Sequence, residues 1–152
     1  MKPFVFRLKT LLEIRKRREE EANIALSRER KKLFDAQAVL AQLVKQQKES
    51  WAEFKEKQAT GGIVVVEFQI WYNFLNLLEK AIKQQKEVIE VIKQAVSIAL
   101  EKVVHAMKGR KAVEKLEEKR FEQYIFEMQQ EEQKVLDEIA ITRYKRQEGD
   151  EF

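Results

Sequence analysis

Apolar residues recur along most of the chain at alternating steps of four and three. A first run of such positions extends from Leu8 to Phe54, and nine of its fourteen places are apolar. A second run extends from Phe68 to Ala106 and is apolar at eleven of twelve places, the exception being Gln85. A mean spacing of about 3.5 residues is the period at which two helices can share a seam along their length. The pattern therefore predicts two long amphipathic helices that pack against each other.

The strongest break in the chain, from Ala59 to Gly62, separates the two runs. Its paired glycines can adopt the positive φ values that end a helix and reverse the chain. A short link between two long helices favours an antiparallel hairpin. We therefore expect an all-α fold, an antiparallel coiled-coil hairpin forming a single domain. Its expected parts are a helix at about 4–59, a turn at about 60–64, a longer helix at about 65–146 and a frayed tail at 147–152, over residues 1–152.

Gly109 is the other possible break. It is either a glycine inside the second helix, with a local change of register, or the boundary of a third helix. Val113 and Leu116 resume the apolar pattern, and a single glycine within a helix costs only about 1 kcal/mol. The first interpretation is therefore favoured.

The unequal helices predict a C-terminal overhang. At about 1.5 Å per residue, the first helix would extend roughly 84 Å and the second roughly 123 Å. If the chain reverses near Gly62, Leu8 faces about Leu116, and everything beyond about Tyr124 lacks a partner. The overhang is nevertheless apolar at Ile125, Phe126, Met128, Val135, Leu136, Ile139, Ile141 and Tyr144. Such a surface indicates a site for another protein, with self-association or a segment folded back as the alternatives.

Composition narrows the class further. Charged residues make up 37% of the chain, against roughly 25% in an average globular domain. Four glycines and one proline are too few for the many turns of sandwiches, barrels or doubly wound sheets. The absence of cysteine excludes disulfides and thiolate sites and fits a reducing compartment. Arg7 and Lys9 interrupt the apolar residues after Met1, which argues against a secretory signal. We expect a soluble, intracellular, mostly helical protein.

The two ends of the chain carry opposite charge. Residues 1–32 hold eleven Lys and Arg against five Glu, whereas residues 117–152 hold six Lys and Arg against eleven Asp and Glu. In an antiparallel hairpin these segments lie at the same end, where exposed cross-helix ion pairs contribute about a few tenths of a kcal/mol each. The same mixture of charges suits electrostatic docking onto a protein partner.

The residues needed for catalysis are missing or scattered. His105 is the only histidine, and nothing near it in the sequence supplies a second type of metal ligand. No glycine-rich phosphate-binding motif occurs, and no serine lies at helical spacing from a histidine. Adjacent acidic pairs such as Glu117-Glu118 point about 100° apart on a helix and do not converge on one reacting atom. We therefore expect a non-enzyme with no metal and no cofactor.

Nucleic acid and membrane partners are both disfavoured. The sequence pI is about 9.2 and residues 15–18 form a basic run, but three glutamates follow at 19–21 and no aromatic stacking platform accompanies it. No apolar run is longer than that from Ile63 to Val66, which is far shorter than the roughly 18 residues of a membrane span. An RNA-binding protein is a third hypothesis. It predicts that the affinity of the chain for RNA falls steeply as salt is added.

Aromatic residues gather on both sides of the predicted turn: Trp51 and Phe54 before it, and Phe68, Trp71, Tyr72 and Phe74 after it. We expect Phe54 and Trp71 to pack across the two helices and hold the turn together. Tyr72 and Phe74 flank the seam position of Trp71, so at least one of them should be exposed. An exposed ring there would form a second contact site.

Three stretches, in order along the chain, resemble the FliJ family, the soluble stalk proteins of the bacterial flagellar type III export apparatus. The first is Phe4-Val5-Phe6-Arg7-Leu8, with Leu11-Leu12 and the basic run after it. The second is Trp71-Tyr72-Asn73-Phe74-Leu75, followed by Leu78, Ile82 and Gln84-Gln85. The third is Leu136-Asp137-Glu138-Ile139-Ala140 with Arg143-Tyr144. With the length, the helices and the lack of cysteine, the resemblance covers essentially the whole chain.

The resemblance implies a coiled coil similar to the central stalk of rotary ATPases, and it implies the partners. Family members bind the hexameric export ATPase with the open end of the hairpin inside its ring, contact the membrane-embedded export gate and escort empty export chaperones. Carried onto this chain, the ring-binding residues are Phe4, Phe6, Arg7, Leu8, Phe126, Ile139, Arg143 and Tyr144. The gate-binding residues are Tyr72, Phe74, Leu75 and Leu78.

The implied setting is cytoplasmic, at the inner face of the membrane, in flagellum biogenesis, protein transport and motility. We expect a monomer or weak dimer without direct membrane insertion. The stalk of injectisome systems has the same architecture and stays an alternative. A competing class is a coiled-coil scaffold or a prefoldin-like holding chaperone, which would form discrete higher oligomers.

Overall fold

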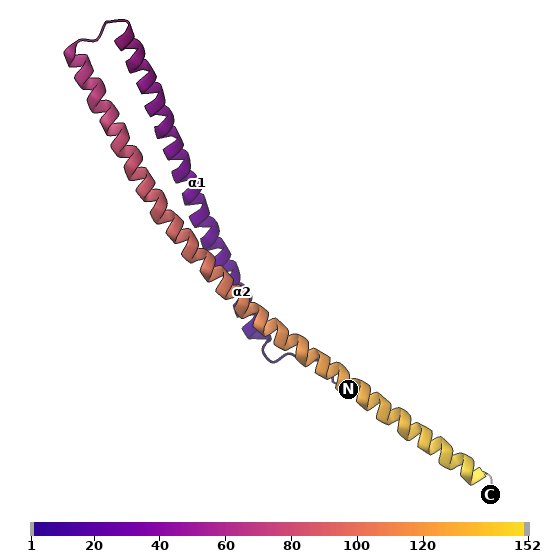
Figure 1. The fold of residues 1–152 in the computed structure, drawn as a ribbon. Coiled ribbons are helices and arrows are strands. Elements are labelled where there is room, and N and C mark those ends of the chain that lie inside the picture. The colour runs from indigo at the N-terminus through magenta and orange to yellow at the C-terminus, as the bar shows by residue number, and fades with distance from the viewer. Residues whose placement is uncertain (1, 151–152) are drawn as a thin grey trace. The chain divides into compact units, whose positions relative to one another are not determined.

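The computed structural model describes residues 2–150, which form two helices, α1 (Lys9–Ala59) and α2 (Val65–Asp150) (Figure 1). The predicted fold class is confirmed: the described residues contain no strand, the helices pack against each other, and α2 is the longer. Two boundaries differ from the prediction. α1 begins at Lys9 rather than near residue 4, and residues 147–150, predicted to fray, belong to α2. Residues 151–152 of the predicted tail lie outside the described residues.

The turn between the helices depends on Gly61. Its φ of +72° lies in the left-handed region, which a residue with a Cβ rarely adopts. Two hydrogen bonds close the end of α1. The hydroxyl of Thr60 donates to the carbonyl of Lys57 at 2.9 Å, and the amide of Gly61 donates to the carbonyl of Gln58 at 3.2 Å. These bonds satisfy carbonyls that the end of a helix leaves without partners.

The chain divides into two compact units. The turn unit is Glu20–His105, and the terminal unit joins the described residues up to Glu19 with those from Ala106 onward. In the turn unit, the two runs of apolar positions predicted from the sequence form the seam between the helices. The buried residues of this seam are Leu26, Ala36, Ser50 and Phe54 of α1 and Leu75, Leu78, Ile82, Ile89 and Ala99 of α2. Gln85, the polar place in the second run, donates across the seam to the carbonyl of Ala36 at 2.9 Å. Phe68, the first place of that run, is exposed instead.

In the terminal unit, the seam between the helices is polar at places of the first run that hold charged residues in place of apolar ones. Arg110 of α2 binds the carboxylate of Glu19 on α1 and that of Glu114 one turn further along α2, the latter at 2.8 Å. These bonds, that with Glu19 first, raise the pKa of Arg110 above its ordinary value. We call Glu19, Arg110 and Glu114 the ionic layer. Because both carboxylates serve one guanidinium, the layer tolerates charge at a position the pattern reserves for apolar residues.

Gly109 lies inside α2, which is continuous through it, so the first interpretation of this glycine is confirmed. Its missing side chain makes room for a partner residue. A Cβ at this position would lie 2.8 Å from Nη1 of Arg15, whose side chain extends over the glycine from α1. The glycine therefore leaves space for Arg15, a charged residue of the seam, and does not interrupt the helix.

Residues 2–8 are not helical and form what we call the N-terminal strap. The amide of Lys9 donates to the carbonyl of Phe6 at 3.2 Å where the strap enters α1. Phe6 is buried with Leu12 and Val113, and Phe4, Leu8 and Leu11 pack around them. The helical pattern was wrong here because these rings gain more burial from lying on α2 than from continuing α1.

Candidate functional site

Aromatic contacts pin the N-terminal strap to α2. The ring of Phe4 lies 5.3 Å from that of Phe121, edge to face, and 5.5 Å from that of Tyr124. The Tyr124 hydroxyl donates to the carbonyl of Lys2 at 2.7 Å. The strap therefore accompanies α2 as far as Tyr124, the position beyond which the sequence predicted an unpartnered helix.

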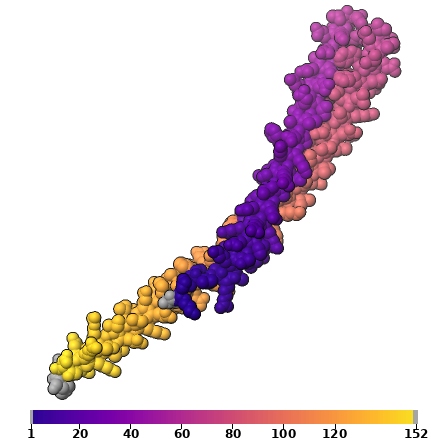
Figure 2. Space-filling model, turned by 180° about the vertical axis from the view of Figure 1, so that it is seen from behind, coloured from indigo at the N-terminus to yellow at the C-terminus, as the bar shows by residue number. Residues whose placement is uncertain are grey.

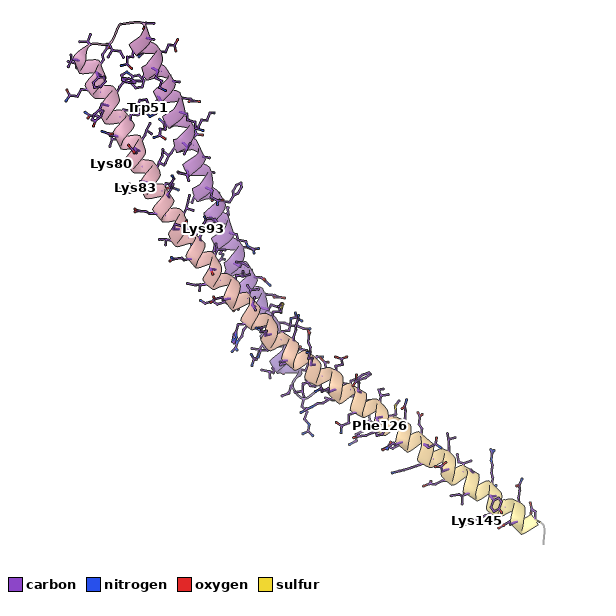
Figure 3. All side chains as sticks on the ribbon, in the orientation of Figure 1. Trp51, Lys80, Lys83, Lys93, Phe126 and Lys145 are labelled. Carbon is purple, nitrogen blue, oxygen red and sulfur yellow. The ribbon has the colours of Figure 1, made fainter. Side chains whose placement is uncertain are left out.

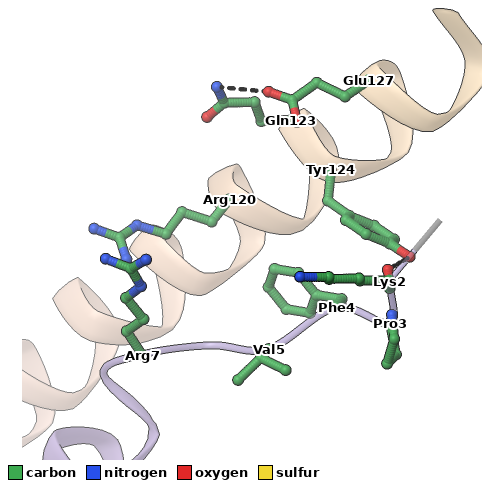
Figure 4. A pocket seen from close by; sticks show the side chains of 9 residues that line it. All are labelled: Lys2, Pro3, Phe4, Val5, Arg7, Arg120, Gln123, Tyr124 and Glu127. Atoms are coloured by element: carbon green, nitrogen blue, oxygen red, sulfur yellow. Dashed lines mark hydrogen bonds between the residues drawn. The ribbon is translucent and has the colours of Figure 1, made fainter. Parts of the chain in front are cut away.

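A basic hollow opens between the strap and α2 (Figure 4). Its cations are Lys2 and Arg7 from the strap and Arg120 from α2, and its walls include Phe4 and Tyr124. Arg7 and Arg120 approach it from the two different elements (Figure 4). Glu127 is the one carboxylate that lines it, and this side chain accepts a hydrogen bond from Gln123 at 3.4 Å. The hollow thus carries an excess of positive charge beside aromatic surface.

Two acidic residues that shortly precede Arg120 on α2 line a different hollow. Glu117 and Glu118 line a second hollow together with Glu114, Phe4 and Phe121. Phe4 is a wall of both hollows, so its ring separates an acidic surface from a basic one. Among the described residues, neither Arg7 nor Arg120 forms an ion pair or a side-chain hydrogen bond. Arg120 instead lies over the ring of Phe6, with its guanidinium carbon 6.0 Å from the centroid.

In the overhang, residues 125–150 of α2, the strap reaches only the first turn, where Glu127 lines the basic hollow and Ile125 and Met128 are half-buried. The overhang is the yellow end of the helix in Figure 2, and Phe126 and Lys145 mark it in Figure 3. Every residue from 129 to 150 is exposed, including Leu136 at 60% and Tyr144 at 63%. The apolar side chains that the sequence singled out as unpartnered are therefore available to another protein.

The apolar residues of the overhang lie on two faces of the helix. Ile125, Met128, Val135 and Ile139 follow the spacing of one face, which also contains Arg143. Phe126 and Tyr144 are separated by about five full turns, so they share a second face. The four overhang residues assigned to ring binding thus divide between two faces. A partner that surrounds the helix can contact both faces at once.

The strap residues assigned to ring binding also differ in accessibility. Phe6 is buried, and Phe4 and Leu8 are half-buried against α2. Arg7 is exposed, as is Val5, which the sequence-based assignment left out. Phe6 therefore holds the strap in place, and its neighbours Val5 and Arg7 form the exposed surface of the strap. The assignment also missed Lys2, Arg120 and Tyr124, whose proximity depends on the fold of the strap and has no pattern in the sequence.

The rings near the turn form one cluster in the turn unit. Phe54 is buried and contacts Trp51 at 5.9 Å, Phe68 at 5.7 Å and Trp71 at 6.2 Å between ring centroids. Lys57 lies over Trp71 at 5.1 Å. The predicted contact between Phe54 and Trp71 across the helices is confirmed.

The residues assigned to the gate fall into two classes. Tyr72 and Phe74 are both exposed, as predicted for at least one of them. Leu75 and Leu78 are buried in the seam, as their places in the second run require. In this conformation Leu75 and Leu78 are not accessible to a partner, unlike Tyr72 and Phe74. Unassigned apolar residues are exposed near the turn as well: Val64, Val65, Val66 and Ile70.

The described residues offer little for other chemistry. Within residues 2–150, no group of three or more His, Cys, Asp or Glu side chains is placed to hold a metal ion. Neither helix of this part of the chain has a stretch long and apolar enough to cross a bilayer.

The comparison with known families agrees with the three stretches that carried the resemblance. The family model described as "Flagellar FliJ protein" matches residues 4–149, nearly the whole described chain. The chain belongs to the FliJ family. No curated protein and no solved structure matches it. As a FliJ protein it is a component of the flagellar export apparatus, and the family is a non-catalytic one.

Proposed function

We propose that this FliJ protein is the stalk of the export ATPase: its terminal unit enters the hexameric ring, promotes ring assembly and orders ATP hydrolysis. One observation carries the proposal. The overhang exposes apolar residues on two faces of a single helix, which suits a partner that surrounds it. The strap adds Arg7 and Val5 next to the base of the overhang.

The physical mechanism is asymmetric contact. A helix with unequal faces inside a ring of equal subunits contacts some subunits differently from others. Such contact shifts the conformational equilibrium of a subunit only by the difference in binding free energy between its states. The ring-binding set is Phe4, Arg7, Leu8, Phe126, Ile139, Arg143 and Tyr144, with Phe6 supporting the strap.

The direct test compares the intact chain with a chain truncated after Gln123, added to the purified export ATPase. We expect the intact chain to stimulate hydrolysis and ring formation and the truncated chain to lose both effects. Circular dichroism should show that the remaining hairpin keeps its helices. A second variant, Ile139→Gln with Tyr144→Gln, retains the length of the helix and should lose most of the stimulation. Equal stimulation by all three proteins would remove the overhang from the proposal.

We further propose that the turn unit contacts the cytoplasmic part of the export gate through Tyr72 and Phe74, supported by Leu75 and Leu78. Phe74→Ala should weaken gate binding by roughly tenfold, because an exposed ring at a contact is worth about 1–2 kcal/mol. Ring binding should be unchanged. The control is Phe34→Ala, another exposed ring of the turn unit. Loss of both partners from Phe74→Ala would indicate general unfolding and contradict the assignment.

Escort of empty export chaperones and a cytoplasmic place at the membrane-bound apparatus complete the proposal. The second candidate is a prefoldin-like holding chaperone, which the exposed Val64, Val65, Val66 and Ile70 near the turn favour. Sedimentation velocity separates the two: a stalk is an elongated monomer or weak dimer, whereas a holding chaperone of this size forms a discrete higher oligomer.

A further inference from the structure

We propose that the basic hollow between the strap and α2 is a carboxylate-binding site, and that its ligand is an acidic segment of the ring-forming ATPase. The inference deepens the proposed function and depends on it. It names Arg120 and Lys2 as contact residues beside Arg7 and specifies the chemistry of the partner.

The first step is the charge of the hollow. Lys2, Arg7 and Arg120 line it against the single carboxylate of Glu127, which is already hydrogen-bonded to Gln123. Two guanidinium groups that share a hollow repel each other, and in this hollow they have no anionic partner among the described residues. A carboxylate placed between them relieves the repulsion and accepts two parallel hydrogen bonds from each planar fork.

The second step is the contrast with the ionic layer. There Arg110 has a raised pKa and two carboxylates, Glu19 and Glu114, at hand. The chain therefore supplies acidic partners where an arginine serves the seam. Arg7 and Arg120 lie only a short way along the same unit, yet Glu117 and Glu118, which shortly precede Arg120 on α2, line the other hollow that Phe4 borders. Of the described carboxylates, only that of Glu127 lines the hollow with this pair.

The third step is the shape of the site. The walls are Phe4 and Tyr124, whose rings lie 5.5 Å apart and are held by the hydrogen bond to Lys2. Aromatic walls beside arginines fit an acidic side chain flanked by apolar ones in a polypeptide. The strap also fixes the backbone of Arg7, so less conformational freedom is lost on binding.

The site also makes the stalk asymmetric. Each chain has one such hollow, whereas a ring of identical subunits presents the same acidic segment several times over. One subunit can occupy the hollow while the others cannot. The hollow thereby supplies differential binding energy of the kind that stalk action requires.

The test uses the full chain and the purified export ATPase, with affinity measured at several salt concentrations. The variant Arg7→Met with Arg120→Met removes both charges, including the guanidinium over Phe6, but keeps an unbranched apolar side chain at each position. The matched control, Arg28→Met with Arg30→Met, removes two charges from exposed positions in the turn unit. We expect the first variant to bind the ring on the order of 10–100-fold more weakly and with a flatter salt dependence, and the control to stay within about twofold.

Arg7→Lys with Arg120→Lys tests the geometry of the fork. It preserves charge but cannot form the paired bonds, so an intermediate loss on the order of tenfold is expected. Zero-length cross-linking with a carbodiimide then joins Lys2 to the carboxylate nearest the hollow. Mass spectrometry should find one acidic ATPase segment joined to Lys2, and the arginine-to-methionine variant should lose this product.

The outcomes separate the two proposals. An intact chain that does not bind the ATPase overturns both. Binding by the intact chain that is equally weakened in the variant and its control overturns the carboxylate site alone, as do cross-links from Lys2 that are unchanged in the variant. Arginine-dependent retention of the chain on single-stranded RNA, with ring binding unaffected, would make the ligand a phosphate and overturn the inference as well.

Discussion

Two parts of α2 have a similar spacing of apolar residues but differ in how far those residues are buried. Between Leu75 and Ala106 the apolar residues of the second run are buried or half-buried against α1, and Ile89 is only 5% exposed. From residue 125 to 150 the apolar residues recur at similar spacing, yet Ile141 is 56% exposed. Periodicity thus predicts that a helix has an apolar face, but it does not say whether the chain itself covers that face. An uncovered face in a helix of this length points to a partner.

The two parts are also held helical by different interactions. In the seam, burial of large side chains stabilises the helix. In the overhang the visible support is local: Gln133 donates to Asp137 at 3.1 Å, and the Thr142 hydroxyl donates to the carbonyl of Glu138 at 2.8 Å. Interactions between residues four apart contribute only about 0.2–0.5 kcal/mol each. The overhang is therefore the less stable part, and a surrounding partner would stabilise it.

The sharpest way to break this comparison is one substitution made in both parts. Ile89→Ala removes buried methyl groups from the seam and should lower the free energy of unfolding by about 2–4 kcal/mol. Ile141→Ala removes the same groups from an exposed site and should change it by less than about 0.5 kcal/mol. Urea unfolding followed by circular dichroism at 222 nm measures both. Equal losses would mean that the overhang packs against something in the free protein.

A second prediction concerns the polar part of the seam. Arg110→Met leaves Glu19 without its cation and should lower the free energy of unfolding, by less than the loss of a fully buried pair would because both side chains are partly exposed. Adding Glu19→Leu should recover most of the loss, because the pair is then apolar. The same unfolding measurement gives the double-mutant cycle. If the two losses simply add, the ionic layer does not act as a unit.

The smallest expected effect is at Gly109. Gly109→Ala should change stability by at most about 1 kcal/mol in the favourable direction, since alanine is the better helix former. The new Cβ meets only the flexible end of Arg15, which can move aside. Gly149→Ala, near the end of α2 with nothing within 4 Å, is the control and should have almost no effect. A clear loss at position 109 would show that the placement of Arg15 matters for the seam.

Much of the fold followed from the sequence because helices and their seams are local and periodic. The fourteen places of the first run and all but one of the twelve in the second are buried or half-buried. Gly61 and Gly62 marked the turn because few other residues tolerate positive φ. The start of the overhang near Tyr124 followed from helix length alone. The family followed from three short stretches, and the match over residues 4–149 confirmed it.

Tertiary structure alone decided the N-terminal end and what surrounds it. Phe4 and Phe6 lie in the stretch expected to be helical, but Phe6 is buried with Val113 and Phe4 is half-buried against Phe121 and Tyr124, residues more than a hundred positions away. That contact turned an expected helix into a strap and brought Arg7 beside Arg120. No local pattern encodes such a meeting, because its free energy comes from surfaces that touch only after the chain has reversed at Gly61.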